Sequence, residues 1–190
     1  VEYCRGNGFH PGTSVRGSRF LYNLARYNEG DGLFFCADVT AIQVIGNEFS
    51  HNKRHGIGDL GNGGDSFNLV SGNVCRENGG NGIQATKGGP NVITGNICLN
   101  NSVSAPGTYA GIMLTDVIET IVTGNLCGTK LKEKEEPSQG YGILEQGSSD
   151  RNLIKGNQVG GNARAGVQTV GAATITAENL GLPSAEKRTS

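Results

Sequence analysis

The sequence predicts an all-β solenoid, a parallel β-helix of about seven coils with three short strands in each coil. Two observations predict it. A short motif containing Asn recurs along most of the chain, and the residues between the motifs form three apolar columns when the repeats are aligned. A repeat of roughly 20 to 50 residues is typical of solenoids, in which each unit buries its apolar side chains only by stacking on its neighbours.

The repeat pairs an Asn with a second Asn five residues later. Six segments carry it: YNLARYN (22–28), GNEFSHN (46–52), GNVCREN (72–78), GNICLNN (95–101), GNLCGTK (124–130) and GNQVGGN (156–162). Lys130 replaces the second Asn of the fifth segment, and a less regular copy spans residues 3–15. Each segment leads into a Gly followed by an aliphatic residue. The 32 Gly and 19 Asn of the chain suit this arrangement, because both residues tolerate left-handed turn geometry.

Three apolar columns run through the aligned repeats. The first, three residues before the leading Asn, contains Phe20, Val44, Val70, Ile93, Val122 and Ile154. The second, two residues after it, contains Ala25, Phe49, Cys75, Cys98, Cys127 and Val159. The third follows the Gly and contains Leu33, Ile57, Ile83, Ile112, Ile143 and Val167. Short apolar stripes between Gly and Asn turns predict strands, which stack in parallel about 4.8 Å apart, and the repeated Asn side chains then form ladders.

Charge and cysteine spacing exclude several functions. The net charge is −1, from 16 Lys and Arg against 17 Asp and Glu, and the chain has no long apolar run, so we expect neither a nucleic-acid surface nor a membrane span. The five cysteines include no C-x-x-C pair, so we expect no metal and no cofactor. Four cysteines are assigned to the second apolar column, namely Cys75, Cys98, Cys127 and, when it is aligned through Asn7, Cys4. Cys36 lies outside it, which leaves a reactive thiol as the alternative there.

The GN-x-x-x-x-N and Gly-Ile repeat resembles the right-handed parallel β-helix superfamily of pectate lyases, alginate lyases, mannuronan epimerases and polygalacturonases, over about residues 3–179. The resemblance implies right-handed coils, which parallel crossovers also prefer. It implies binding of an extended, uronate-containing polysaccharide, with activity as a metal-independent lyase or epimerase, and favours an extracellular or cell-surface location. The calcium-binding Asp group, the G-x-D-x-x-D set and the Arg-Pro-Lys pattern of other members are missing, which disfavours a calcium-dependent pectate lyase or a polygalacturonase.

The coils are expected to occupy residues 1–179, as part of a longer solenoid, and residues 180–190 to form a polar tail or cap. The first coil begins close to Val1 without a capping segment. Because an open coil exposes strand edges, we expect further N-terminal coils or a second copy of the chain to cover that end.

Two insertions indicate the functional face. Residues 101–111 and 130–142 both enlarge the turn before the Gly-aliphatic strand, so they are expected to wall one side of a groove. The residue before that strand forms a ladder of Asp31, His55, Asn81, Ala110, Tyr141 and Ala165, with His10 near the same place in the first coil.

We therefore predict a catalytic cluster in which Asp31 and His55 serve as base and partner and His10 as acid. The expected substrate-binding residues border the same sheet and are Arg54, Asp59, Lys87, Tyr141 and Glu145. Arginine binds a sugar carboxylate through two parallel hydrogen bonds, which suits a uronate substrate.

Two alternatives remain open. Polar residues before a turn Gly also cap strands, so the same pattern fits a non-catalytic β-helix module of a surface or phage-type fibre that binds glycans. Ice binding would need regular outward Thr ladders, and Thr86 with Thr115 is the adjacent outward pair that the aligned repeats contain.

Overall fold

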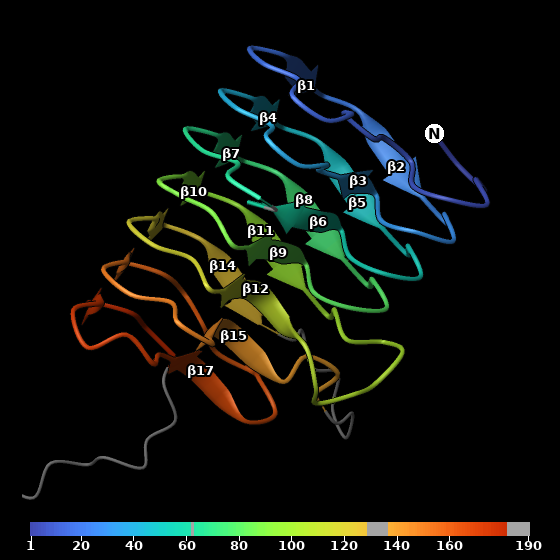
Figure 1. The fold of residues 1–190 in the computed structure, drawn as a ribbon. Coiled ribbons are helices and arrows are strands. Elements are labelled where there is room, and N and C mark those ends of the chain that lie inside the picture. The colour runs from blue at the N-terminus through green and yellow to red at the C-terminus, as the bar shows by residue number, and fades with distance from the viewer. Residues whose placement is uncertain (62, 129–136, 182–190) are drawn as a thin grey trace, which may run out of the picture.

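The structure, a computed structural model, describes residues 1–61, 63–128 and 137–181. These residues form 18 strands and no helix, so none of them belongs to a helix that could cross a membrane. The strands make three parallel sheets. Within each sheet, strands of successive coils lie side by side, so that the coils stack from β1 at one end to β17 near the other (Figure 1). The predicted all-β parallel solenoid with three strands in each coil is confirmed.

Each sheet takes one strand from each successive coil. The first sheet contains β1 (Arg19–Leu21), β4 (Gln43–Ile45), β7 (Leu69–Ser71), β10 (Val92–Thr94), β13 (Ile121–Thr123), β16 (Leu153–Lys155) and β18 (Ile175–Ala177). The second contains β2 (Leu24–Arg26), β5 (Glu48–Ser50), β8 (Val74–Arg76), β11 (Ile97–Leu99) and β14 (Leu126–Gly128). The third contains β3 (Leu33–Phe34), β6 (Ile57–Leu60), β9 (Ile83–Thr86), β12 (Ala110–Thr115), β15 (Tyr141–Gln146) and β17 (Ala165–Gln168).

The described coils number about six, slightly fewer than the seven that the repeats predict. The sheets hold seven, five and six strands. The irregular first copy accounts for part of the difference, because it joins its neighbour through the isolated bridges Glu2–Arg26 and Phe9–Leu33 rather than through full strands. Of the predicted tail, residues 182–190 lie outside the described residues, as do residues 129–136 of the second insertion.

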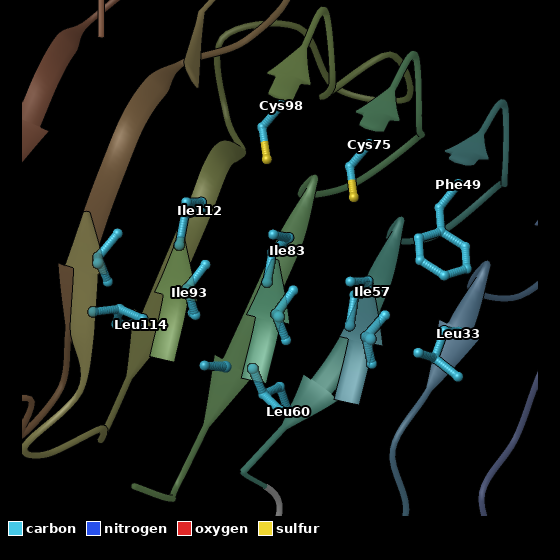
Figure 2. Packing of buried hydrophobic residues seen from close by; sticks show 14 of the residues in the cluster. Leu33, Phe49, Ile57, Leu60, Cys75, Ile83, Ile93, Cys98, Ile112 and Leu114 are labelled. Carbon is cyan, nitrogen blue, oxygen red and sulfur yellow. The ribbon is translucent and has the colours of Figure 1, made fainter. Parts of the chain in front are cut away.

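The three apolar columns meet inside the coil. Every member of the second column is fully buried, and so are the members of the other two except Phe20 and Val167, which lie at the ends of the stack and are partly exposed. Figure 2 shows Cys75 and Cys98 facing the aliphatic side chains of the third sheet. The strand register places Cys75, Cys98 and Cys127 directly above one another, and the cysteines are unbridged. They act as small buried hydrophobic side chains.

Asn ladders line two corners of the coil, as predicted. In the first, each Asn side chain accepts hydrogen bonds from the backbone and side chain of the Asn one coil before it, through Asn23, Asn47, Asn73, Asn96, Asn125, Asn157 and Asn179. In the second ladder, Gln139 stands between two Asn residues: its Oε1 atom accepts from Asn101 Nδ2 and its Nε2 atom donates to Asn162 Oδ1. A buried backbone N–H without a partner costs about 1 to 3 kcal/mol, so these side chains satisfy turns that strand pairing leaves open.

The predicted position of Cys4 is wrong. Its backbone N–H donates to the Asn28 side chain at 3.0 Å, so Cys4 occupies the Asn position of the first coil and not the apolar column. The reason is the strand register, because the bridge between Glu2 and Arg26 sets a uniform offset of 24 residues between the first coil and the second.

Candidate functional site

A pocket of about 510 Å³ opens on the outward face of the third sheet. Its lining comes from four neighbouring coils and consists of Lys53, Arg54, His55, Gly80, Asn81, Gln84, Ser104, Thr108, Tyr109, Met113 and Gln146. Gln84 and Met113 belong to β9 and β12, and they face outward because the buried Ile83 and Ile112 before them face inward. The described lining contains two cationic side chains and no carboxylate.

The first insertion forms one wall of the pocket, where the sequence placed it. Ser104, Thr108 and Tyr109 belong to this loop and line the pocket. The loop is fixed to the coil beneath it, because Ser104 donates from its backbone N–H and its hydroxyl to the Gly79 carbonyl at 3.1 and 2.6 Å. The tip of the second insertion lies among residues 129–136, outside the described part of the chain.

The ladder before the Gly-aliphatic strand exists, and its contacts run from side chain to backbone. The Asp31 carboxylate accepts the His55 backbone N–H at 2.7 Å, and His55 Nδ1 accepts the Asn81 backbone N–H at 2.8 Å. Asn81 Oδ1 accepts the Ala110 N–H at 2.7 Å in the same way. Each side chain caps the next coil, which is a structural task that Asp, His and Asn share because all three present an acceptor.

These contacts fix the chemical state of His55. Since Nδ1 accepts a hydrogen bond, the proton of the neutral ring is on Nε2, which can then only donate. Burial, with the Arg54 guanidinium nearby, lowers the pKa of the His55 imidazole to about 4. The ring also lies against Gly80, where a Cβ atom would stand 2.5 Å from Nδ1. His55 therefore enters the site as a neutral hydrogen-bond donor at physiological pH.

We expect His55 to remain neutral, as its Nε2–H tautomer, until the pH falls close to 4. Nitrogen-15 correlation spectra of the imidazole rings measured from pH 8 to pH 4 will follow this directly. Below about pH 6.5 the unfolded chain binds a proton that folded His55 does not, so the free energy of unfolding should fall between about pH 6.5 and 4, by up to about 3 kcal/mol. His55→Gln should lose this part of the pH dependence, and an unchanged profile would contradict the assignment.

Asp31 lies beneath the surface and not in the pocket. Its side chain is fully buried, and the Asp31 Oδ2 atom has no hydrogen-bond partner among the described residues. Arg54 Nη1 lies 3.6 Å from that oxygen, and the Arg54 side chain is 53% exposed. Burial raises the pKa of the Asp31 carboxyl, against the opposing effects of the His55 N–H and Arg54. Asp31 and His55 are neighbours, yet the imidazole does not bind the carboxylate.

The predicted position of His10 is wrong. Asn7, through its Oδ1 atom, accepts the Asp31 N–H at 2.8 Å and occupies the ladder position of the first coil. His10 instead meets Phe34, with ring centroids 5.0 Å apart and an interplanar angle of 84°. The uniform offset of the first coil places His10 beside Phe34, so the side chains of His10, Asp31 and His55 do not converge.

Among the predicted substrate-binding residues, Arg54 lines the pocket and the other four do not. Asp59 occupies a bulge in β6 with a positive φ of 53°, and Lys87 lies at the exposed turn after β9. Tyr141 packs on Ala110, Met113 and Leu144 beside the pocket, and its hydroxyl is 3.4 Å from Arg164 Nη1.

The expectation that Glu145 faces the substrate is contradicted by its burial. Glu145 is fully buried and points into the coil, because residues of β15 alternate and Ile143 also faces inward. Its carboxylate accepts hydrogen bonds from the Asn152 and Thr174 side chains at 2.8 and 3.0 Å, and from two backbone N–H groups of the last coil. Glu145 thus holds the last coil in place.

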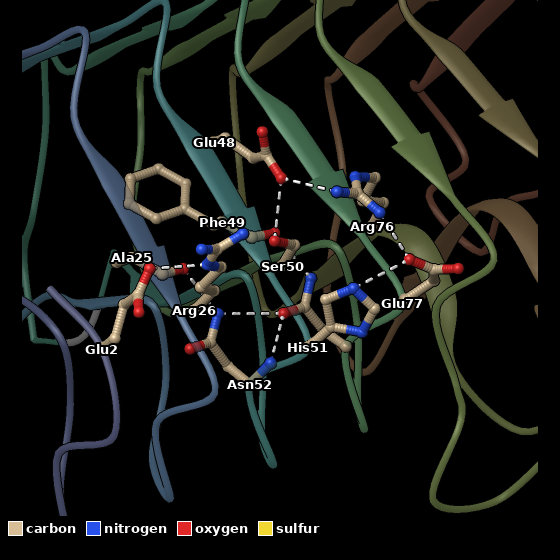
Figure 3. A network of polar contacts seen from close by, with 11 residues as sticks. Glu2, Ala25, Arg26, Glu48, Phe49, Ser50, His51, Asn52, Arg76 and Glu77 are labelled. Atoms are coloured by element: carbon tan, nitrogen blue, oxygen red, sulfur yellow. Dashed lines mark hydrogen bonds and ion pairs between the residues drawn. The ribbon is translucent and has the colours of Figure 1, made fainter.

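The remaining histidine, His51, belongs to a charged network on the second sheet (Figure 3). His51 Nε2 lies 3.1 Å from Glu77, which also binds Arg76 at 2.6 Å, and Arg76 reaches Glu48 at 2.8 Å. His51 also stacks on Tyr27, with ring centroids 4.9 Å apart. These contacts leave His55 as the histidine of the pocket.

Sequence reasoning missed Lys53, Gln84 and Tyr109 as site residues. Tyr109 carried a signal, because it lies in the insertion expected to wall the groove. Lys53 and Gln84 carried none beyond their positions, since the stacking of four coils decides which outward side chains share a pocket.

The chain belongs to the right-handed β-helix family, whose sequence profile for a right-handed β-helix region matches residues 3–180. A comparison with curated proteins gives no significant match. The membership confirms the predicted superfamily and the right-handed coil.

Solved structures with this fold include alginate-modifying enzymes. The A-module of the mannuronan C-5 epimerase AlgE6 of Azotobacter vinelandii superposes with a TM-score of 0.81 at 19% identity, over 94% of this chain and 49% of that chain. The periplasmic alginate epimerase AlgG gives 0.77 at 15% identity, over 94% and 43%. The A-module of AlgE4 of Azotobacter vinelandii gives 0.72 at 17% identity, over 90% and 48%. The chain thus spans about half the length of these structures, and at such identities the likeness shows the fold.

Proposed function

We propose that the protein binds an acidic, uronate-containing polysaccharide on the third sheet, with one sugar carboxylate at the pocket. The observation that carries this proposal is the lining of the pocket, which combines Lys53 and Arg54 with amide and hydroxyl groups and includes no carboxylate among the described residues. Cationic and amide donors suit an anionic sugar, whose carboxylate and hydroxyl oxygens accept hydrogen bonds.

Arg54 is the principal anion-binding residue of this proposal. The distance of 3.6 Å to Asp31 Oδ2 is long for a hydrogen bond, so the guanidinium has donors left for a ligand. Lys53 already lies 2.9 Å from Glu29, and both of these side chains are more than half exposed. His55 contributes a neutral Nε2–H donor, and Tyr109 contributes a ring and a hydroxyl from the insertion. The likeness to alginate epimerases supports uronate as the sugar class.

Binding without chemistry is better supported than catalysis by the predicted residues. Proton abstraction at C5 needs a base within reach of the sugar. Asp31 is fully buried, His55 is a donor at Nε2, and His10 lies beside Phe34. A metal-independent lyase or epimerase remains the second candidate, favoured by the mannuronan epimerases among the solved structures that share the fold. Turnover of oligouronates, followed by unsaturated product or by proton exchange at C5, distinguishes the two functions.

Arg54→Gln is expected to weaken binding of a uronate oligomer by about tenfold to a hundredfold, because a charge-assisted hydrogen bond contributes about 1.5 to 3 kcal/mol. Isothermal titration calorimetry with oligomannuronate, oligoguluronate and oligogalacturonate will measure this. Arg54→Lys should fall between, since it keeps the charge and loses the paired hydrogen bonds.

The matched control is Arg151→Gln. Arg151 is 52% exposed and 3.2 Å from Glu119, so it resembles Arg54 in exposure and pairing, and it lies before β16 of the first sheet. This variant should bind as the original protein does. If no acidic oligomer binds, or if both variants lose affinity equally, the proposed function is wrong.

A further inference from the structure

We propose that Phe34 and His10 form a second, aromatic sugar-binding subsite, so that the polysaccharide runs from the pocket along the third sheet toward the first coil. This inference rests on the proposed function and deepens it, because it assigns the direction of the bound chain and a minimum ligand length. It also gives a role to two residues that lie outside the pocket.

The strand register places the subsite on the same face as the pocket. Phe34 is paired with Gly58 of the next coil, and the coil after that, which pairs with β6 across its bulge, contributes Gln84, which lines the pocket. Phe34 faces outward because its neighbours Leu33 and Phe35 are fully buried. Two steps of about 4.8 Å therefore separate the aromatic subsite from the pocket floor, a distance that a short oligosaccharide spans.

Arg54 lies between the two places. A Cβ atom on Gly58 would stand 2.7 Å from the Asp31 carboxylate, so this carboxylate fills the outward position between Phe34 and Gln84. Arg54 Nη1 lies 3.6 Å from the same carboxylate and is exposed. A sugar chain that leaves the pocket toward Phe34 thus passes over a guanidinium, which can bind the carboxylate of an intervening uronate.

In the opposite direction, the row of outward positions that continues Gln84 is covered. Beyond Gln84, the next outward positions are Met113 and Leu144, which are 8% and 1% exposed. They form an apolar cluster with Ala110 against which Tyr141 packs. Along this row the partly exposed Phe34 lies on the first-coil side of the pocket, whereas Gln146 of β15 forms the far end of the pocket lining.

The chemistry of Phe34 and His10 suits a sugar ring. His10 is exposed and meets Phe34 at right angles, so the pair presents an edge and a face rather than two rings stacked on each other. The C–H groups of one face of a pyranose ring pack on aromatic rings, as other partly polar rings do. Because such contacts depend on a flat aromatic ring, replacing the ring of Phe34 tests the subsite.

The test compares oligouronates of two and of five residues by isothermal titration calorimetry. The original protein should bind the longer oligomer about tenfold or more tightly than the shorter one. Phe34→Ala and Phe34→Leu should remove most of this difference and leave binding of the shorter oligomer unchanged. Phe34→Leu keeps an apolar side chain, so its effect separates loss of the ring from loss of packing, and circular dichroism will confirm that both variants fold.

The control is Phe67→Ala, because Phe67 is 69% exposed and precedes β7 of the first sheet. This variant should keep the preference for the longer oligomer. Equal binding of both oligomers by the original protein, or an unchanged preference in both Phe34 variants, would overturn the aromatic subsite and leave the pocket standing. Failure of both oligomers to bind would overturn the proposed function and the subsite with it.

Discussion

Asn96→Asp is expected to destabilise the protein by about 3 to 5 kcal/mol at neutral pH, because it leaves an uncompensated charge in the core. Asn96 is fully buried, and its Nδ2 group donates to the Val70 carbonyl and to Asn125 Oδ1, both at 3.0 Å. An aspartate places an oxygen against those two oxygens, while the bonds that Asn96 accepts from Asn73 remain. Urea unfolding followed by circular dichroism will measure the loss.

The loss should shrink as the pH falls, since protonation removes the charge and restores one donor. Asn179→Asp provides the control within the same ladder. Asn179 is the last rung and is partly exposed, and its Nδ2 donates to the Ile154 carbonyl at 3.0 Å. Its replacement should cost about 1.5 kcal/mol or less, because solvent reaches the new charge. Equal losses at the two positions would contradict burial of the new charge as the cause of the larger cost at Asn96.

Gly82→Ala is expected to cost about 3 kcal/mol, because it overfills a tightly packed interior. An added Cβ atom would stand 2.6 Å from the Gly111 carbonyl oxygen and 2.9 Å from Asn101 Nδ2. Gly32, Gly56, Gly111 and Gly142 meet the same kind of obstacle, since the carbonyl of the next coil lies 2.5 to 2.9 Å from each added Cβ. At these Gly positions the backbone therefore lies too close to the next coil and to the second Asn ladder to carry any side chain.

Gly12→Ala is the matched control for this substitution. No atom lies within 4 Å of a Cβ added at Gly12, so the change should leave stability within about 0.5 kcal/mol of the original. Thermal and urea unfolding of both variants will decide. If Gly82→Ala proves as stable as Gly12→Ala, the repeated Gly is retained for a reason other than close approach of the coils.

The repeat predicted the fold because each coil sets the same requirements at the same positions. Val44, Val70 and Ile93 are buried in register, as aligning the Asn motifs requires. The ladder of Asp31, His55 and Asn81 was also correctly aligned. A third ladder was missed, since Thr120 stands between Asn91 and Asn152 and Thr174 follows Asn152, which hides the period from a search for Asn alone.

The predictions that proved wrong concern positions where one residue decides the strand register, or decides whether a side chain faces inward or outward. His10 and Cys4 were misplaced because the first copy was aligned by its Asn residue, whereas parallel pairing with the second coil fixes a constant offset. Glu145 was expected to border the sheet and bind substrate, whereas its strand alternation and four hydrogen bonds hold it inside.

The sequence by itself determined the coil, its three strands and the turns, because stacking repeats the same local environment at each period. Only the tertiary structure decided the site. The pocket depends on how the insertion at residues 101–111 folds over the coils, and on which atom of His55 faces a backbone N–H. Neither follows from the period, because a loop outside the repeat obeys no register, and one hydrogen bond to Nδ1 changes a predicted catalytic group into a neutral donor.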